Sequence, residues 1–344
     1  MIVCVTEQGA KIRREDQTLV VEGKELPTRL FPAQIEQLLL YGSIHLTAQA
    51  RYLLLRENID TVFLRQDGSY LGRLHTEAGE NVFLRQKQFI AASNPEFCLK
   101  IARAIVDAKI HNQRSFLGRL GREHGLADND KAVAELAELR RKLAQAENLD
   151  SCRGYEGAAS AIYFQQFRKA FHEDYGFTHR ARRPPPDPVN AALSFAYSLL
   201  ENRCHAACRI AGLDPAPSAL HPPEYGRHSL PLDLMEEFRV KIADALVLAL
   251  FNKHMLGSAD FEAEPKGDGS QAEAGADAAI KGVYLKKDAM KKVIRAFAHK
   301  LGENSTPAGF MKPVGHGDAI LEQARRYRRH IEGELECYAP LHFR

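Results

Sequence analysis

The sequence predicts an α+β protein with two domains, a small β domain over residues 1–84 followed by a larger all-helical domain over residues 85–344. Before about residue 76, short runs of β-branched and large apolar residues alternate with turn signals, which is typical of strands. From about residue 85 the apolar residues recur at helical spacing. A chain of 344 residues is long enough for two domains with separate cores.

The first domain is expected to contain six strands and one helix. Turn residues separate the strands, and the pair Asp67-Gly68 is a favourable hairpin turn because glycine tolerates positive φ. Thr47 can cap a helix over Ala48–Glu57. The predicted strands are Ile2–Thr6, Lys11–Arg14, Thr18–Val21, Ile35–Leu40, Asp60–Leu64 and Tyr70–Leu74.

The second domain is expected to be built from helices separated by proline-rich breaks. Phe97, Ile101, Ile105 and Ala108 follow helical spacing, and residues 132–147 are rich in strong helix formers. Consecutive prolines cannot continue a helix, so breaks are predicted at residues 182–188, 212–217 and 221–223. The region near residues 257–276 is rich in Gly, Ala and acidic residues and predicts a mobile loop.

The composition excludes several classes of protein. The net charge of +3 permits a nucleic-acid surface but does not require one. No segment approaches the roughly 18 consecutive apolar residues that a membrane span needs. The six cysteines lack paired C-x-x-C spacing, which argues against a disulfide framework or a zinc site. The first residues lack a basic signal region and predict a strand, so the cytoplasm is the expected compartment.

Two short segments carry the residues best suited to chemistry. Glu156 lies between Tyr155 and Gly157, and His221 precedes an acidic stretch. In that stretch Asp233, Glu236 and Glu237 are spaced i, i+3 and i+4, so they share one side of a helix. One imidazole with several carboxylates is a ligand set for Mg²⁺ or Mn²⁺, and the imidazole favours Mn²⁺. Such a metal can polarise a phosphodiester.

Each signal also has an ordinary structural interpretation. Acids such as Asp233 are common at helix N-termini because they complement the macrodipole. Glu156 alone reads as a helix-start glutamate, and His221 alone reads as an exposed loop histidine. The two segments form a metal site only if they converge in space. Otherwise they are polar patches on a helical protein.

Taken together and in order, the motifs resemble the CRISPR-associated integrase family, the Cas-one proteins. Each motif is weak alone, but the ordered set over about ninety residues is specific, and the resemblance extends over nearly the whole chain. The motifs are Gly154-Tyr155-Glu156-Gly157, Arg183-Pro184-Pro185, Asp187–Tyr197, Gly212–Pro215, His221 and Ser229–Arg239.

The resemblance implies a metal-dependent DNA integrase and endonuclease of CRISPR adaptation. In that family a free 3′-hydroxyl of a short DNA fragment, the spacer, attacks a phosphodiester of the CRISPR repeat, and the same site nicks branched DNA. The resemblance implies a homodimer formed through the first domain, a small ferredoxin-like partner (Cas-two), double-stranded DNA as substrate and an accessory end-processing nuclease. The implied metal ligands are Glu156, His221 and Glu236, with Asp233 as an accessory acid.

The resemblance also implies residues close to DNA. Arg239 matches a basic position near the DNA, and Asn190 matches a polar position close to the site. In the basic stretch from Arg180 to Arg183, we expect Arg182 and Arg183 to contact phosphates, and Tyr163 either stacks on bases or packs in the core. This sequence has Ser218-Ala219-Leu220 before His221, which departs from the usual family pattern.

Two other functions compete with the integrase interpretation. A DNA-binding scaffold with merely structural acids would bind DNA in a salt-sensitive way without metal dependence. A metal hydrolase of small phosphoesters would need no DNA surface. A neighbouring gene for a ferredoxin-like partner and a repeat array would favour the integrase.

Overall fold

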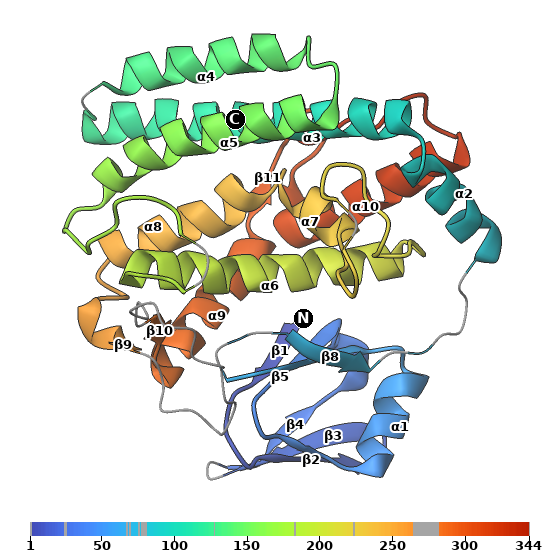
Figure 1. The fold of residues 1–344 in the computed structure, drawn as a ribbon. Coiled ribbons are helices and arrows are strands. Elements are labelled where there is room, and N and C mark those ends of the chain that lie inside the picture. Colours follow the sequence, from blue (N-terminus) through green and yellow to red (C-terminus); the bar gives the residue numbers. More distant parts are fainter. Residues whose placement is uncertain are drawn as a thin grey trace, which may run out of the picture. The chain divides into compact units, whose positions relative to one another are not determined.

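The chain folds into two compact units, Met1–Glu80 and Asn81–Arg344, which are described separately (Figure 1). The computed structural model describes residues 2–23, 26–66, 68, 70–74, 76, 81–126, 128–181, 184–222, 224–263 and 282–343. The first unit is rich in strands and the second in helices, so the predicted fold class is confirmed. The predicted boundary at residue 84 falls inside helix α2 (Val82–Ala92), which belongs to the second unit.

The described part of the first unit contains two four-stranded sheets with the strand orders β1-β5-β7-β8 and β4-β3-β2-β6. All six predicted strands are present. The strands β4 and β6 were missed because they span only three and two residues. The strands are β1 (Ile2–Val5), β2 (Lys11–Glu15), β3 (Thr18–Glu22), β4 (Thr28–Leu30), β5 (Gln37–Tyr41), β6 (His45–Leu46), β7 (Asp60–Leu64) and β8 (Tyr70–Leu74).

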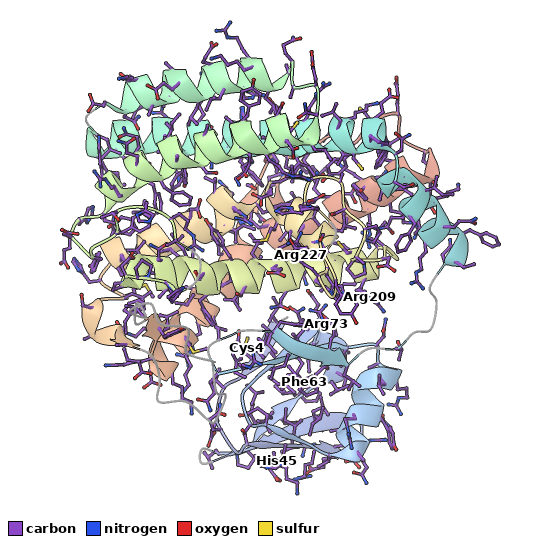
Figure 2. All side chains as sticks on the ribbon, viewed as in Figure 1. Cys4, His45, Phe63, Arg73, Arg209 and Arg227 are labelled. Atoms are coloured by element: carbon purple, nitrogen blue, oxygen red, sulfur yellow. The ribbon has the colours of Figure 1, made fainter. Side chains whose placement is uncertain are left out.

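One core joins the two sheets of this unit to its helix. Helix α1 (Ala48–Arg56) begins as predicted, because the Thr47 side chain accepts a hydrogen bond from the backbone N–H of Ala50. Leu53 on this helix packs with Ile12 of one sheet and Leu38 of the other. Phe63 packs against this core from a partly buried position (Figure 2). Burial of this apolar surface stabilises the unit.

The second unit is a stack of helices (Figure 1). Helix α3 packs against α4 and α5, and α6 packs against α7 and α10. Asn81, Asn94, Asn148 and Asp187 cap α2, α3, α5 and α6 by accepting backbone N–H bonds. The remaining helices are α3 (Pro95–His124), α4 (Asn129–Leu143), α5 (Leu149–Phe167), α6 (Pro188–Ile210), α7 (Leu230–Met235), α8 (Ala245–Asn252), α9 (Lys287–Gly302) and α10 (His316–Glu332), with a π-helix, η3, over Arg239–Asp244.

Short strands interrupt this unit, so the prediction that it is all-helical is wrong in detail. Strand β9 (Phe261–Ala263) pairs with β10 (Val283–Leu285), and β11 (Asn304–Ser305) pairs with β12 (Val314–Gly315). Each strand is too short to leave a periodic signal in the sequence.

The start of the predicted mobile loop near residues 257–276 is ordered. A 3₁₀ turn over Ser258–Asp260 precedes β9, and Phe261 is buried against Phe251. Asp260 forms an ion pair with Lys292 at 2.8 Å. These contacts hold the segment in place, and residues 264–276 of the predicted loop lie outside the described residues. In the part of the chain that the structure describes, no helix combines the length and apolar character needed to cross a bilayer.

Candidate active site

Glu156 lies well inside helix α5, and not at its start as the ordinary interpretation of the sequence supposed. The helix begins after Asn148, whose side chain accepts the backbone N–H of Ser151 at 2.8 Å. The side chain of Glu156 is 28% exposed, and Ser160, one turn further on, donates to its Oε1 at 3.2 Å. The helix therefore presents Glu156 as a partly accessible carboxylate.

Asp233 on α7 holds the loop that carries His221. Its Oδ2 accepts the backbone N–H groups of Ala219 at 2.8 Å and Leu220 at 2.9 Å. Its Oδ1 accepts the backbone N–H of His221 at 3.0 Å. Because the contacts before His221 are made by backbone amides, the unusual Ser218-Ala219-Leu220 sequence leaves this anchoring intact.

The same carboxylate orients the imidazole of His221. Nδ1 of His221 lies 2.7 Å from Oδ1 of the buried Asp233, so the hydrogen bond assigns the ring proton to Nδ1. The lone pair is then on Nε2, which lies 3.8 Å from Oε1 of Glu236. A carboxylate that fixes the tautomer and direction of a histidine is the usual companion of a metal-binding imidazole.

Glu156 and Glu236 meet at the ammonium group of Lys109. Lys109 projects from α3 with only 5% exposure, and its Nζ lies 2.7 Å from Oε2 of Glu236. The same Nζ donates to Oε1 of Glu156. Segments far apart in the sequence thus bring Glu156 and Glu236 to one ammonium, and His221 lies on the other oxygen of Glu236.

Surrounding positive charge keeps Glu236 ionised. Burial alone would raise the pKa of this carboxyl, but nearby positive charge, Arg239 first and Lys109 next, lowers its pKa to about 2. The strongest named partner is Arg239, whose Nη2 lies 2.9 Å from Oε1 of Glu236. Glu236 is therefore available as an anionic oxygen donor at neutral pH.

The donor set suits a divalent cation once the ammonium has moved. Within the described residues, no three His, Cys, Asp or Glu side chains stand in a geometry that could hold a metal ion. Lys109 occupies the space between the two carboxylates. Oε2 of Glu236 is buried, and Lys109 is its ion-pair partner. Among the described residues, no donor has the geometry of a hydrogen bond to this oxygen. Two carboxylates and one imidazole match the ligands preferred by Mn²⁺ and Mg²⁺.

Glu237 faces away from this cluster. Its Oε2 accepts hydrogen bonds from the backbone N–H of Leu341 and from Nε2 of Gln323, both at 2.8 Å, and Tyr338 donates to its other oxygen. Burial raises the pKa of Glu237 to about 7, and these donors moderate the shift. Glu237 therefore ties the segment around Leu341 to the helix, as expected for an acid outside the proposed ligand set.

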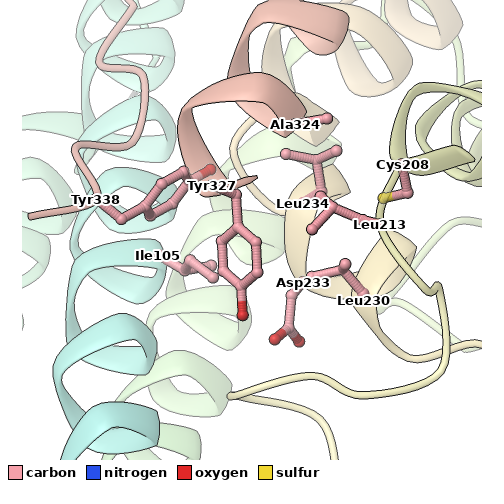
Figure 3. Close-up of a pocket in the computed structure, with 9 residues that line it drawn as sticks. All are labelled: Ile105, Cys208, Leu213, Leu230, Asp233, Leu234, Ala324, Tyr327 and Tyr338. Atoms are coloured by element: carbon pink, nitrogen blue, oxygen red, sulfur yellow. The ribbon is translucent and has the colours of Figure 1, made fainter. Parts of the chain in front are cut away.

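Behind Asp233 lies a small apolar cavity, shown in Figure 3. Ile105, Leu234 and Tyr327 line it, with the carboxylate of Asp233 at one side (Figure 3). Most of the lining is apolar, and the hydroxyl of Tyr327 lies on the same side as the carboxylate (Figure 3). The hydrogen bonds that Asp233 accepts come from the His221 loop.

A larger cavity of about 660 Å³ opens beside Glu156 and Lys109. Arg168, Arg180 and Arg239 also line it. Its volume falls within the usual range for ligand sites, roughly 300–1,000 Å³. A cavity lined by several arginines, with the carboxylate of Glu156 among its walls, suits a phosphate-bearing substrate.

The π-helix that follows Glu236 shapes this cavity. π-Helical turns are rare and often mark functional sites. Here Arg239 and Asp244 stand at the two ends of the π-helix, and both line the cavity. The guanidinium groups of Arg239 and Arg180 lie 4.8 Å and 5.2 Å from the centroid of the Tyr197 ring, so cation–π contacts hold both cations in place.

Two residues predicted to contact DNA are buried. Tyr163 is 0% exposed, and its hydroxyl donates to Asp244 at 3.0 Å, so it packs in the core and does not stack on bases. Asn190 is also 0% exposed. Its Oδ1 accepts from Nη1 of Arg180 and from the backbone N–H of Ala181, both at 2.9 Å. Asn190 therefore positions Arg180 and does not face a DNA surface, and of the two alternatives for Tyr163 the structure shows packing in the core.

The other predicted DNA contacts remain predictions. Arg239 has a side chain that is 12% exposed and lines the cavity. Arg182 and Arg183 lie outside the described residues.

Lys109 and Asp244 were missed in the sequence analysis. Lys109 follows Ile101 and Ile105 at four-residue steps on α3, so a charge in an otherwise apolar stripe was the available signal. Asp244 sits among Ile242, Ala243 and Ala245, where one acid interrupts an apolar run.

Asp244 predicts a measurable pH dependence of stability. Burial raises its pKa from 3.8 to about 6, although the hydroxyls of Tyr197 and Tyr163 favour the ionised form. In the unfolded chain this carboxyl loses its proton near pH 4, whereas in the folded chain it keeps the proton up to about pH 6. The free energy of unfolding therefore falls as the pH rises from about 4 through 6. The shift corresponds to about 3 kcal/mol.

Replacing Asp244 by asparagine removes this contribution. Between pH 4 and pH 7, the free energy of unfolding measured with urea is expected to fall by about 3 kcal/mol more in the wild type than in the variant. Parallel curves for the two proteins over this interval would contradict the assignment.

The fold and the site together define a class of two-domain protein in which a helical domain carries a Glu–His–Glu cluster beside a basic cavity. The chain belongs to the Cas1 family: the family profile described as CRISPR associated protein Cas1 matches residues 3–299. CRISPR-associated endonuclease Cas1 2 of Rhodospirillum rubrum is 34% identical, and the match covers 98% of this chain and 97% of that protein. The family resemblance of the sequence motifs is thereby confirmed.

A longer relative and two solved structures extend the comparison. A CRISPR-associated exonuclease Cas4/endonuclease Cas1 fusion of Geobacter sulfurreducens is 33% identical over 97% of this chain and 59% of the fusion. A casposase bound to integration product matches with a TM-score of 0.82 at 23% identity, covering 98% of this chain and 92% of that chain. A Cas6-RT-Cas1–Cas2 complex matches with a TM-score of 0.81 at 23% identity, covering 99% of this chain and 36% of that chain. These two structures share the fold.

Proposed function

We propose that this protein is a metal-dependent DNA integrase and endonuclease of CRISPR adaptation. It joins the 3′-hydroxyl ends of short DNA fragments, the spacers, to a CRISPR array by transesterification. The observation that carries the proposal is that one ammonium pairs with both Glu156 and Glu236, that Nε2 of His221 lies 3.8 Å from Glu236, and that Glu156 lines a basic cavity. Membership in the Cas1 family supports it.

The residues of the site have distinct roles in this proposal. Glu156, His221 and Glu236 would hold Mn²⁺ or Mg²⁺, which when bound stabilises negative charge on a phosphodiester and assists ionisation of the attacking hydroxyl. Asp233 accepts from Nδ1 of His221, which leaves Nε2 of the neutral ring as the donor atom for a metal and directs it at Glu236. Arg239 brings positive charge to the cavity, where phosphate oxygens would bind.

The same site would nick branched DNA, with water in place of the 3′-hydroxyl. Double-stranded DNA of the spacer and the repeat is the proposed substrate. The proposed assembly is a homodimer formed through residues 1–84, with a small ferredoxin-like Cas2 partner and an accessory end-processing nuclease. The names of a Cas1–Cas2 complex and of a Cas4/Cas1 fusion among the matches support these two partners. The cytoplasm remains the predicted compartment.

A strand-transfer assay tests the proposal. The protein and its Cas2 partner are incubated with a labelled DNA fragment and a supercoiled plasmid carrying the repeat. We expect covalent joining with Mn²⁺ or Mg²⁺, no joining in EDTA, and no joining of a fragment that ends in a 3′-deoxy nucleotide, because that fragment lacks the nucleophile.

The outcomes separate the three functions. Salt-sensitive DNA binding with no metal-dependent product would favour a DNA-binding scaffold. Metal-dependent hydrolysis of p-nitrophenyl phosphate without DNA binding would favour a small-phosphoester hydrolase. Either result would contradict the integrase.

A further inference from the structure

Lys109 is a buried cation placed between the two carboxylates of the site. Lysine is rarely buried unless it is paired, and the ammonium of Lys109 is paired twice, with Glu156 and with Glu236. Glu236 is 3% exposed, so leaving its charge without a partner would be costly. The ammonium therefore offsets the repulsion between two carboxylates that the fold brings together from separate segments.

A divalent cation and this ammonium compete for the same place. Both are attracted by Oε1 of Glu156 and Oε2 of Glu236, and the ammonium already lies 2.7 Å from the second oxygen. A metal held by both carboxylates would have to displace Lys109.

The side chain of Gln113 offers the displaced ammonium a new partner. Gln113 follows Lys109 by one helical turn on α3, where residues four apart are neighbours. It is 2% exposed and lines the 660 Å³ cavity together with Lys109. Its Oε1 is buried and has no hydrogen-bond partner among the described residues, whereas its Nε2 donates to Oγ of Ser160 at 3.5 Å.

We propose that Lys109 is a displaceable counter-cation that holds Glu156 and Glu236 together without metal and moves to Gln113 when a divalent cation binds. The flexible four-carbon stem of lysine allows this movement. Oε1 of Glu156 keeps its hydrogen bond from Ser160 when the ammonium leaves. The inference rests on the proposed metal site and deepens it by naming the residue that controls metal uptake.

Replacing Lys109 by methionine tests the inference through metal affinity, measured by isothermal titration of the full-length protein with Mn²⁺ alone. Methionine keeps much of the length and removes the charge. We expect the affinity for Mn²⁺ to rise by about tenfold, because no ammonium has to be displaced. In EDTA we expect this variant to melt several degrees below the wild type. Mn²⁺ should then raise the melting temperature of the variant by more than it raises that of the wild type.

Lys241→Met is the matched control. Lys241 is a partly buried lysine of the same unit that lies 5.8 Å from the centroid of the Phe343 ring. The Lys241→Met protein should bind Mn²⁺ with the affinity of the wild type. Gln113→Leu is an independent second variant that keeps Lys109. It should bind Mn²⁺ more weakly, because the displaced ammonium loses its acceptor.

The results distinguish failure of this inference from failure of the metal site. Unchanged or weaker Mn²⁺ binding by Lys109→Met, with wild-type binding intact, would overturn the role of Lys109 alone. If Lys109→Met does not fold, wild-type affinity in Gln113→Leu would overturn it. Absence of Mn²⁺ binding by the wild type would overturn both this inference and the proposed metal site.

Discussion

Replacing Glu236 by glutamine is expected to reduce metal-dependent strand transfer by about 10²- to 10³-fold. The substitution keeps the shape of the side chain but removes the buried anionic donor between Lys109, Arg239 and His221. The amide retains one oxygen for Arg239, so the main loss is the charge that a divalent cation needs. Initial rates with the DNA fragment and plasmid, corrected for the folded fraction by circular dichroism, measure the effect.

Glu237→Gln is the matched control for this experiment. Glu237 is the adjacent buried carboxyl, and its pKa of about 7 means that the neutral form is already well populated at neutral pH. The amide of the variant can accept from Leu341 and Gln323 on its oxygen and donate to Tyr338. We expect strand transfer within about twofold of the wild type, a change of less than roughly 0.5 kcal/mol. Equal losses in both variants would show that the effect is structural.

Replacing Asp233 by alanine is expected to damage both stability and activity. The carboxylate accepts three backbone N–H bonds from Ala219, Leu220 and His221, and a fourth bond from the imidazole. Hydrogen bonds to charged groups contribute about 1.5–3 kcal/mol each, and the buried donors would lose their partner. We therefore expect a loss of about 3 kcal/mol or more in the free energy of unfolding, measured by urea titration.

Asp233→Asn separates positioning from folding. Its oxygen can still accept from the two backbone amides of Ala219 and Leu220, whereas the backbone N–H of His221 loses its acceptor, so we expect a smaller loss of stability than in Asp233→Ala. Its –NH₂ group would then face Nδ1 of His221 as a donor, which moves the ring proton to Nε2 and removes the lone pair from the cluster. Loss of such an orienting partner typically lowers metal affinity or activity by about 10- to 100-fold. Wild-type strand transfer in a folded Asp233→Asn protein would contradict this role.

Secondary-structure elements that depend on a few neighbouring residues could be predicted from local patterns in the sequence. The six strands of the first unit and the cap by Thr47 are of this kind. The strands β4 and β6 were missed because two or three residues cannot show alternation. The pairing of β9 with β10 joins segments separated by residues 264–282, so no local pattern could reveal it.

The site shows a similar division between residue identity and residue role. The ordered motifs pointed to Glu156, His221 and Glu236, and in the structure Lys109 pairs with the two glutamates while His221 lies beside Glu236. Motif position did not distinguish a residue that touches a substrate from one that supports its neighbours. Asn190 illustrates this limit, because only its burial and its bonds to Arg180 and Ala181 reveal a positioning role. Such burial depends on packing by distant segments.

Titration of Mn²⁺ into the metal-free protein, followed by electron paramagnetic resonance of the free ion, tests the central claim most directly. The wild type is predicted to bind one Mn²⁺ at the cluster at neutral pH, where Glu236 is ionised. Glu156→Gln and His221→Ala should each weaken this binding by at least about tenfold, whereas Glu237→Gln should bind as the wild type does. Wild-type affinity in both Glu156→Gln and His221→Ala would contradict the claim that these residues hold the metal.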